Sequence, residues 1–342
     1  MLNVGLVGFG FASKVFHAPV IRAVEGLRLT TIVQRSGSGD ATYADVEFVR
    51  SVDELLERPI DLVVVATPNT SHHPIAKQSL LAGRHVVVDK PFTVTLADAE
   101  ELVRLGKETG RVLSVYQERR YTGDCVTVQK VVSEGLLGRI VTFEHHFDRF
   151  RPELKPPPGA WREQRLPGSG VWYDLGPHLL DYALLVFGIP QALGADIRIE
   201  RDGAVVDDAF DVTLHYPRMR AVLRASMLAA GSAPTFVVRG TNGSFIKYGQ
   251  DPQEGALKAG QTPDMPDWDL ESPEMYGRLT TPEGTRAVPT VPTSFTRYYE
   301  NIRDVILGKT ELAVTPQQAL EVMRGLELAV ASSQKRCVLP WK

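Results

Sequence analysis

The chain has 342 residues, of which 43% are hydrophobic, and this length predicts two packed domains rather than one core. Its 38 basic and 41 acidic side chains nearly cancel, without a dense Lys/Arg block, which argues against a nucleic-acid partner. The opening MLNVGLVGFG has neither a basic leader nor a run of apolar residues long enough to cross a bilayer. We therefore expect a cytoplasmic protein with no membrane partner.

The sequence contains only two cysteines, Cys125 and Cys337. Two cysteines at this spacing support neither a disulfide framework nor a metal site, so we expect no metal. Both are predicted to be inert packing residues.

The first 120 residues alternate short apolar, β-branched runs with helical patterns. Such alternation is typical of a parallel sheet covered by helices on both faces. The expected strands are 3–7, 29–33, 62–66, 85–88 and 112–115. Ser51 with Glu54, and Thr95 with Asp98, have the spacing of helix capping boxes, and the second helix should run towards Gly110. This region is predicted to be a Rossmann domain spanning 1–120.

From residue 121 to 342 the apolar pattern lengthens and alternates, which predicts an α+β domain with a large, mostly antiparallel sheet. The expected strands are 140–147, 211–216, 221–227 and 236–239. One face of such a sheet must be solvated or paired with another subunit, so we expect a homodimer or homotetramer formed through this sheet. The fold class is thus α/β, with this domain for substrate binding and oligomerisation.

Two stretches are rich in proline and glycine, 151–159 and 251–292, and are predicted to be long loops. A last helix is predicted over 315–334, because Pro316 suits a first helical turn and Gln318 has the spacing of a capping box with Thr315.

The turn after the first strand reads GFGFAS, with Gly8 and Gly10 at the first two positions of the dinucleotide fingerprint and Ser13 at the third. The first glycine permits a tight turn, and the second lets the backbone approach a pyrophosphate held at a helix N-terminus. Phe11 and Ala12 continue this turn and are expected to line the cofactor. The alternative is a simple glycine turn with no ligand.

An NAD-binding domain usually ends its second strand with an acidic residue that holds the ribose 2′-hydroxyl. Here the strand ends Gln34, Arg35, Ser36, without a carboxylate to repel a 2′-phosphate. Arg35 is expected to pair with that phosphate and stack on the adenine, which favours NADP while leaving NAD possible. The alternative is that Arg35 is an ordinary solvated residue.

Two further segments carry candidate catalytic groups. Lys90 follows the fourth predicted strand, at the sheet edge where open α/β sheets hold ligands. In GSGVWYDLGPHLLD, Pro177 suits a first helical turn, so His178 is expected beside the helix N-terminus. The positive end of the helix dipole disfavours the imidazolium form there, and a neutral histidine can accept a proton. Asp174 is expected to cap the helix, orient His178 or bind a hydroxyl. Taken one at a time, each residue has a simpler interpretation: Lys90 as a surface lysine, Asp174 as a helix cap and His178 as a core histidine.

The motifs occur in a specific order: GFGFAS, then TPNTSH at 67–72, then DKP at 89–91, then DLGPH at 174–178. This order resembles that of the glucose-fructose oxidoreductase/inositol dehydrogenase/rhizopine catabolism (Gfo/Idh/MocA) family, over most of the chain. Finer matches at 114–121, 147–153, 161–163 and from residue 245 are similar to the branch containing NADP-dependent scyllo-inositol dehydrogenases.

The resemblance implies that Lys90, Asp174 and His178 form the catalytic group, with Lys90 also beside the cofactor. It further implies that the last helix packs on the Rossmann domain. Residues expected near the nicotinamide are Thr67, Pro68, Asn69 and His72. The departure is Asp89, where the family motif usually has Glu; carboxylate chemistry is kept.

The resulting hypothesis is hydride transfer between the nicotinamide and a ring alcohol or ketone of a polyol or sugar, with His178 moving the proton and Lys90 stabilising the developing negative charge. Polyol binding needs several hydrogen-bonding groups against an aromatic wall. The candidates are Tyr116, Arg120, Arg149, Trp161 and Arg162, with Trp161 and Arg162 preferred. The alternatives are a reductase of another sugar or keto compound, and a non-catalytic NADP-binding sensor.

Overall fold

The computed structural model describes residues 1–37, 39–154, 161–231 and 233–342. By its internal contacts the chain divides into two compact units. Unit 1 comprises Met1–Tyr121, Gln253–Trp268 and Ser294–Leu320; unit 2 comprises Thr122–Pro252, Asp269–Thr293 and Glu321–Lys342. The sequence assigned everything after residue 120 to one domain, but two later segments belong to unit 1.

Unit 1 is built on a six-stranded, fully parallel sheet in the order β3-β2-β1-β4-β5-β6. The strands are β1 (Leu2–Val7), β2 (Leu27–Val33), β3 (Glu47–Val49), β4 (Leu62–Val65), β5 (His85–Asp89) and β6 (Leu113–Tyr116). This order is that of a Rossmann fold, in which ligands bind at the carboxyl ends of the strands. The five predicted strands are present, and the short edge strand β3 was missed.

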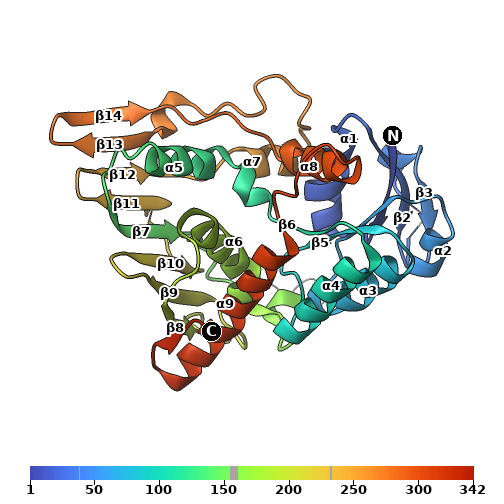
Figure 1. Cartoon of the computed structure of the whole chain (residues 1–342), viewed down its shortest axis with the longest axis horizontal. Helices are drawn as coiled ribbons and strands as arrows, with labels where there is room; N and C mark the ends of the chain where they lie inside the picture. Colours follow the sequence, from blue (N-terminus) through green and yellow to red (C-terminus); the bar gives the residue numbers. More distant parts are fainter. Residues whose placement is uncertain (38, 155–160, 232) are drawn as a thin grey trace. The chain divides into compact units, whose positions relative to one another are not determined.

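Two helices of unit 1, α2 (Val52–Leu56) and α4 (Leu96–Thr109), begin at the capping residues that the sequence predicts. The other helices described in this unit are α1 (Ala18–Arg22), α3 (His72–Leu81), α7 (Gln253–Lys258) and α8 (Thr296–Ile306), and α3 lies beside α4 (Figure 1). The Ser51 hydroxyl accepts the N–H of Glu54 at 3.1 Å, and the Thr95 hydroxyl accepts that of Asp98 at 3.2 Å. Both predicted N-caps are confirmed, as is the end of α4 at Gly110, which has φ +63°.

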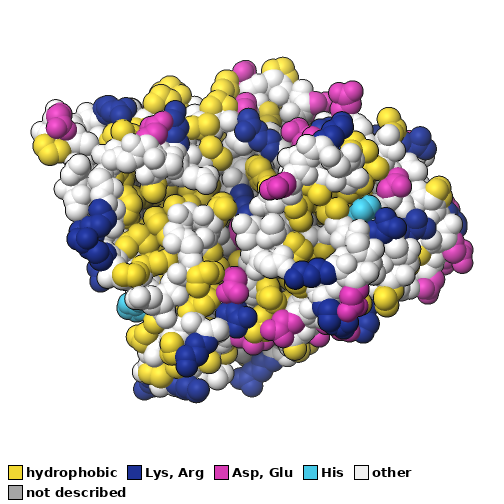
Figure 2. Space-filling model, viewed as in Figure 1, with side chains coloured by type: hydrophobic (Ala, Val, Ile, Leu, Met, Phe, Trp, Pro, Cys, Tyr) yellow, Lys and Arg dark blue, Asp and Glu magenta, His cyan; other side chains and the backbone are white. Residues whose placement is uncertain are grey.

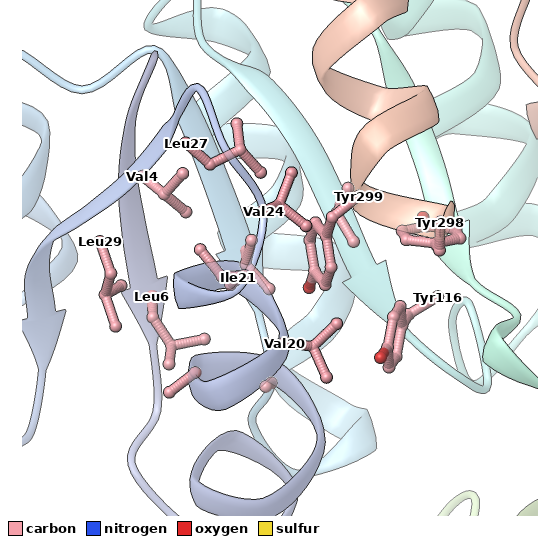
Figure 3. Packing of buried hydrophobic residues seen from close by; sticks show 14 of the residues in the cluster. Val4, Leu6, Val20, Ile21, Val24, Leu27, Leu29, Tyr116, Tyr298 and Tyr299 are labelled. Carbon is pink, nitrogen blue, oxygen red and sulfur yellow. The ribbon is translucent and has the colours of Figure 1, made fainter. Parts of the chain in front are cut away.

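The core of unit 1 explains why two late segments join it. Figure 3 shows Tyr298 and Tyr299 of α8 turned towards Tyr116 of β6, beside apolar side chains of β1 and α1. Trp268 and Phe295 belong to the same buried cluster. Because large apolar side chains gain the most free energy from burial, these segments are held to the Rossmann sheet.

Unit 2 is built on a nine-stranded sheet in the order β14-β13-β12-β11-β7-β10-β9-β8-β15. Only the pair β10 and β7 is parallel, so the prediction of a mostly antiparallel sheet is confirmed. The strands are β7 (Ile140–His146), β8 (Ala192–Arg198), β9 (Ala209–His215), β10 (Arg220–Ser226), β11 (Phe236–Gly240), β12 (Ser244–Lys247), β13 (Gly277–Thr281), β14 (Gly284–Val288) and β15 (Leu339–Pro340).

Helices α5 (Gly123–Ser133) and α6 (Gly170–Phe187) pack on the sheet of unit 2, α6 against β10 and β9 (Figure 1). The prediction of one long loop over 251–292 was wrong, because α7 and the β13–β14 hairpin lie within it. The β14 side of that hairpin is largely exposed, so its residues lack the apolar alternation by which a strand is recognised. Most of the predicted loop 151–159 lies outside the described residues; 151–154 are neither helix nor strand.

The last helix, α9 (Pro316–Lys335), begins with the predicted capping box. The Gln318 N–H donates to the Thr315 hydroxyl at 3.2 Å, and the Gln318 side-chain oxygen accepts the Thr315 N–H at 3.0 Å. Its first turn belongs to unit 1 and the remainder to unit 2. Of the two cysteines, Cys125 is buried as expected, but Cys337 is exposed, so its prediction as a packing residue was wrong.

Within the described ranges no helix has the length and apolar character needed to cross a membrane. Figure 2 shows Lys and Arg side chains interspersed with Asp and Glu on the viewed face.

Candidate active site

The two glycines in the turn after β1 lie in different surroundings. Gly8 has φ +94°, and a Cβ at this position would lie 2.6 Å from the Ala66 carbonyl oxygen, so the fold itself requires glycine. At Gly10 φ lies outside the left-handed region, and no described atom comes within 4 Å of a built Cβ. Since neither backbone strain nor packing explains Gly10, the open space above it fits a close-approaching ligand such as a pyrophosphate.

The chain after the turn begins as helix but winds as a π-helix over Ser13–His17 before α1. Ser13 is fully buried, and its hydroxyl donates to the Ala66 carbonyl at 3.4 Å, as expected of a small third fingerprint residue. Phe11 is 62% exposed and Ala12 is half-buried, so both remain available to a cofactor.

The end of β2 carries the residues expected to choose between NADP and NAD. Arg35 and Ser36 are exposed, and within the described ranges the Arg35 guanidinium has no hydrogen bond or ion pair. Gln34 instead shapes the loop: its side-chain oxygen accepts the Gly39 N–H at 3.2 Å, and Arg50 donates to its carbonyl at 3.0 Å. Gln34 therefore supports this loop, while Arg35 remains a candidate for contact with a 2′-phosphate.

Lys90 directly follows β5, at the carboxyl edge of the sheet, and is half-buried. The peptide bond from Lys90 to Pro91 is cis. The Asp89 carboxylate accepts the Lys90 backbone N–H at 2.7 Å and lies 3.8 Å from Nε2 of buried His17. Burial alone would raise the pKa of Asp89, but the neighbouring His17 and the Lys90 charge hold that pKa below its usual value. Asp89 thus carries a negative charge beside the backbone of Lys90.

His72 is enclosed beside Thr67 and Pro91. Its ring is fully buried, with Nδ1 at 2.8 Å from the Pro91 carbonyl oxygen and Nε2 at 2.9 Å from that of Thr67. Burial lowers the pKa of His72, although Asp89 and the two carbonyls oppose that shift. The ring of His72 therefore has no exposed surface, and its place near the nicotinamide stays a prediction. His72 joins the loop after β4 to the loop after β5.

The other residues of the 67–72 motif are more accessible. Thr67 is half-buried and accepts a hydrogen bond from the Ser71 hydroxyl at 2.9 Å, Pro68 is exposed, and Asn69 is 5% exposed. Thr67 and Pro68 therefore remain candidates for cofactor contact, and Asn69 offers only a small accessible area.

Two predicted substrate residues of unit 1 have structural roles. The Tyr116 hydroxyl donates to the Phe16 carbonyl at 2.9 Å, and the side chain is 1% exposed. Arg120 donates to the Ala313 carbonyl at 3.0 Å and to the Gln318 side chain at 3.1 Å. Tyr116 thus joins β6 to the segment after the glycine turn, and Arg120 holds a late segment of the chain to the loop after β6, so the structure does not support them as substrate ligands.

Sequence reasoning overlooked Glu118, which is 8% exposed in the loop after β6. Burial raises its pKa to about 7, although the charges of Arg119 and Lys90 act in the opposite direction. The effect of the Lys90 charge on Glu118 is electrostatic and could not be inferred from the spacing of the two residues.

In unit 2, helix α6 begins earlier than predicted. It starts at Gly170, so Pro177 lies in its interior and His178 is two turns from its N-terminus. The cause is Asp207, whose carboxylate accepts the Trp172 N–H at 2.6 Å and whose carbonyl accepts that of Val171 at 2.9 Å. The dipole argument for a neutral His178 therefore fails, because the dipole acts within the first turn.

The same helix places Asp174 and His178 four residues apart, and hence on one face. Asp174 does not cap the helix, as it lies in the second turn. Its carboxylate is 3.2 Å from Nε of Arg162 and 3.9 Å from Nη1 of Arg149. Each guanidinium covers an aromatic ring, Arg162 over Trp161 at 4.6 Å and Arg149 over the preceding Phe147 at 4.9 Å.

Unit 2 thus brings together five residues predicted from distant parts of the sequence: Arg149, Trp161, Arg162, Asp174 and His178. His178 is 4% exposed, Asp174 is 22% exposed and Arg162 is 47% exposed at their side chains. The cluster combines a carboxylate, two cations and an aromatic face, which can bind a molecule with several hydroxyl groups. In the described part of the chain, no group of three His, Cys, Asp or Glu side chains is arranged for a metal.

Comparison with known families gives two matches that together cover most of the chain. Residues 2–117 match the GFO_IDH_MocA oxidoreductase family model for the NAD-binding Rossmann fold, and residues 129–340 match its model for the C-terminal alpha/beta domain.

Individual relatives align over nearly their full length. The uncharacterized oxidoreductase YdgJ of Escherichia coli (strain K12) is 44% identical over 99% of this chain and 98% of its own. The scyllo-inositol 2-dehydrogenase (NADP(+)) IolW of Bacillus subtilis (strain 168) is 36% identical over 98% and 94%. A crystal structure of an oxidoreductase from Bacillus cereus superposes with a TM-score of 0.91 at 35% identity, over 100% of this chain and 99% of that one.

Proposed function

Because the chain belongs to the Gfo/Idh/MocA oxidoreductase family, we propose that it is an NADP-dependent dehydrogenase that interconverts a ring alcohol and a ketone of a cyclitol or sugar. The first substrate we propose is scyllo-inositol. The observation that carries this is the end-to-end similarity to an NADP-dependent scyllo-inositol dehydrogenase, in a chain that retains Lys90, Asp174 and His178.

The preference for NADP is supported by the end of β2. An acidic residue there would accept the ribose 2′-hydroxyl of NAD and repel the 2′-phosphate of NADP. This chain has Gln34, Arg35 and Ser36 instead, and the exposed Arg35 guanidinium offers a forked, permanently charged donor to a phosphate. The turn at Gly8 and Gly10, with Phe11 and Ala12, is our proposal for the pyrophosphate site. For the nicotinamide end we propose Thr67, Pro68, Asn69 and Lys90.

The roles of the catalytic residues follow from their chemistry. NADP, when bound, supplies the hydride acceptor for alcohol oxidation. We assign His178 to accept the proton of the reacting hydroxyl, and Lys90 to donate a hydrogen bond to the same oxygen, where negative charge develops. In the reducing direction Lys90 polarises the carbonyl and His178 returns the proton. Asp174 accepts hydrogen bonds from neighbouring hydroxyls or orients His178.

For the substrate we propose the cluster of unit 2. Arg149 and Arg162 donate to ring oxygens, Asp174 accepts from hydroxyls, and the Trp161 face packs on the C–H groups of the ring. We therefore assign the cofactor to unit 1 and the polyol to unit 2. We also propose a dimer or tetramer formed through the nine-stranded sheet, and a location in the cytoplasm.

The test is the initial rate of absorbance change at 340 nm with purified protein, offering NADP+ and NAD+ separately with scyllo-inositol, myo-inositol and common aldoses. Reduction of NADP+ by an inositol, lost in Lys90→Met and His178→Ala, is the expected result. Turnover that survives both substitutions would refute the assigned roles. NADP binding without turnover of any polyol or keto-sugar would instead favour a sensor.

A further inference from the structure

A buried ion-pair network in unit 2 reaches the turn that carries Trp161 and Arg162 and takes no part in the mechanism above. Its centre is Arg201, just beyond β8, whose side chain is 4% exposed. The Arg201 Nε donates to the Asp208 carboxylate at 2.9 Å, and Asp208 is fully buried. That carboxylate also accepts the backbone N–H groups of Glu200 at 2.6 Å and Arg201 at 3.1 Å. Asp208 is thereby satisfied by groups of its own neighbourhood.

The other end of the guanidinium reaches a different segment. Nη1 of Arg201 donates to the Glu163 carboxylate at 3.1 Å and to the carbonyl oxygens of Arg151 at 3.2 Å and Glu153 at 3.3 Å. Arg201 therefore holds two described stretches of chain, one ending at residue 154 and one beginning at residue 161. A planar fork suits this bridging task, because its donors point in fixed and different directions.

Glu163 shares a single helical turn with two residues of the substrate cluster. Residues Trp161–Glu163 form one 3₁₀ turn, closed by the Gln164 N–H on the Trp161 carbonyl at 3.2 Å. Within this turn Arg162 reaches Asp174 at 3.2 Å and covers the ring of Trp161. A turn of three residues has little stability of its own, so an external anchor decides where its side chains point.

We propose that Arg201 and Glu163 are positioning residues: the Arg201–Glu163 ion pair fixes the 161–163 turn, and the turn presents Arg162 to Asp174 and so to the polyol. The kinetic consequence rests on the proposed function; the structural consequence does not. Losing the pair lowers the fraction of molecules in which Arg162 is in place, which weakens substrate binding and leaves the chemical step unchanged.

Glu163→Ala is the informative variant, because it removes the anchor while the buried pair of Arg201 with Asp208 remains intact. Truncating Arg201 itself would strand a buried carboxylate and endanger folding. We expect Glu163→Ala to raise the KM for the polyol about tenfold, equivalent to about 1.4 kcal/mol, with kcat changed less than about twofold. Glu163→Gln keeps an oxygen that accepts from Arg201, so it should restore a KM within about threefold of the wild-type value.

The matched control is Glu101→Ala, which removes another partly exposed carboxylate, 29% exposed and paired with Lys77 at 2.7 Å in unit 1. It should leave the KM for the polyol unchanged. Since Glu163 is proposed to act through Arg162, combining Glu163→Ala with Arg162→Ala should raise KM no further than Arg162→Ala alone. Additive effects in this cycle would overturn the proposal.

A second measurement is independent of catalysis. The chain has four tryptophans, so ¹⁹F NMR of 5-fluorotryptophan protein gives four signals, and Trp161→Phe identifies that of Trp161. Glu163→Ala and Arg201→Lys should shift or broaden this signal, and Glu101→Ala should not. An unchanged Trp161 signal would refute the proposal that the Arg201–Glu163 ion pair fixes the 161–163 turn, even if no polyol is turned over. A changed signal without turnover would support that role of the ion pair and count against the proposed function alone.

Discussion

The contrast between Gly8 and Gly10 predicts opposite outcomes for one chemical change. Gly10→Ala adds a methyl group where no described atom lies within 4 Å and where φ is outside the left-handed region. Its folded state should therefore be unharmed, and the loss of unfolded-state freedom should stabilise the protein by up to about 1 kcal/mol. If the space holds a pyrophosphate, the same methyl group clashes with the bound cofactor and weakens its binding free energy by about 1–3 kcal/mol, which raises the Kd for NADPH about fivefold to 150-fold.

Gly8→Ala should behave in the reverse manner. Its φ of +94° costs a non-glycine residue about 1–2 kcal/mol, and the Cβ would lie 2.6 Å from a backbone oxygen, which cannot rotate away. We expect a clearly lower melting temperature, measured by thermal unfolding monitored by circular dichroism, with NADPH binding measured calorimetrically below the transition. If Gly10→Ala binds NADPH as the wild type does, the open space is not the pyrophosphate site. If it unfolds as readily as Gly8→Ala, the packing argument fails.

Three further predictions concern single side chains. In the 340 nm assay, Arg35→Ala should raise the KM for NADP+ about tenfold to 100-fold and the KM for NAD+ less than about twofold, because only the contact with the 2′-phosphate is lost. An equal rise in KM for both cofactors would contradict the assignment of Arg35. Burial raises the pKa of Glu118 to about 7, so the protein should lose stability as the pH rises from about 4.5, where this group ionises in the unfolded chain, to about 7. Over that range the free energy of unfolding of Glu118→Gln, measured in urea, should rise by up to about 3 kcal/mol relative to the wild type. A difference between the two proteins that does not change with pH would rule this out. Asp207→Ala should lower the free energy of unfolding by about 0.5–2 kcal/mol, because it removes the acceptor of the Trp172 N–H, whereas Asp207→Asn should retain most of the stability. If both variants lose the same free energy in urea unfolding, the hydrogen bond that caps α6 is not what stabilises it.

Much of unit 1 could be predicted because its signals are local. The glycine turn, the capping residues Ser51 and Thr95, and the apolar strand runs each depend on neighbours within a few residues. The start of α6 could not be predicted in this way, because its cap is Asp207, 37 positions beyond Gly170 in the numbering of the chain. Local spacing made Pro177 resemble a first-turn proline, and the long-range cap overrode it.

The site was predicted in part for a similar reason. Motif order selected Lys90, Asp174 and His178 as candidates, but no pattern distinguishes an arginine that faces substrate from one that holds the chain together. Arg120 proved to be of the second kind, and Arg162 lies against Asp174. The sequence around Arg201 gave no signal, since its partners are brought to it only by the fold.

The energetics of these ion pairs indicate different purposes. The contact of Arg162 with Asp174 is partly exposed, 47% and 22%, and pairs of this kind contribute about 0–1 kcal/mol to folding. Stability therefore gives little reason to place two guanidiniums and an indole around one carboxylate, which agrees with our proposal that this cluster binds the polyol. The pair of Arg201 with Asp208 is 4% and 0% exposed, so breaking it is costly, about 3–5 kcal/mol. A rigid buried pair that extends one more donor to Glu163 can thus hold a weak, exposed contact in the geometry that our proposal for polyol binding requires.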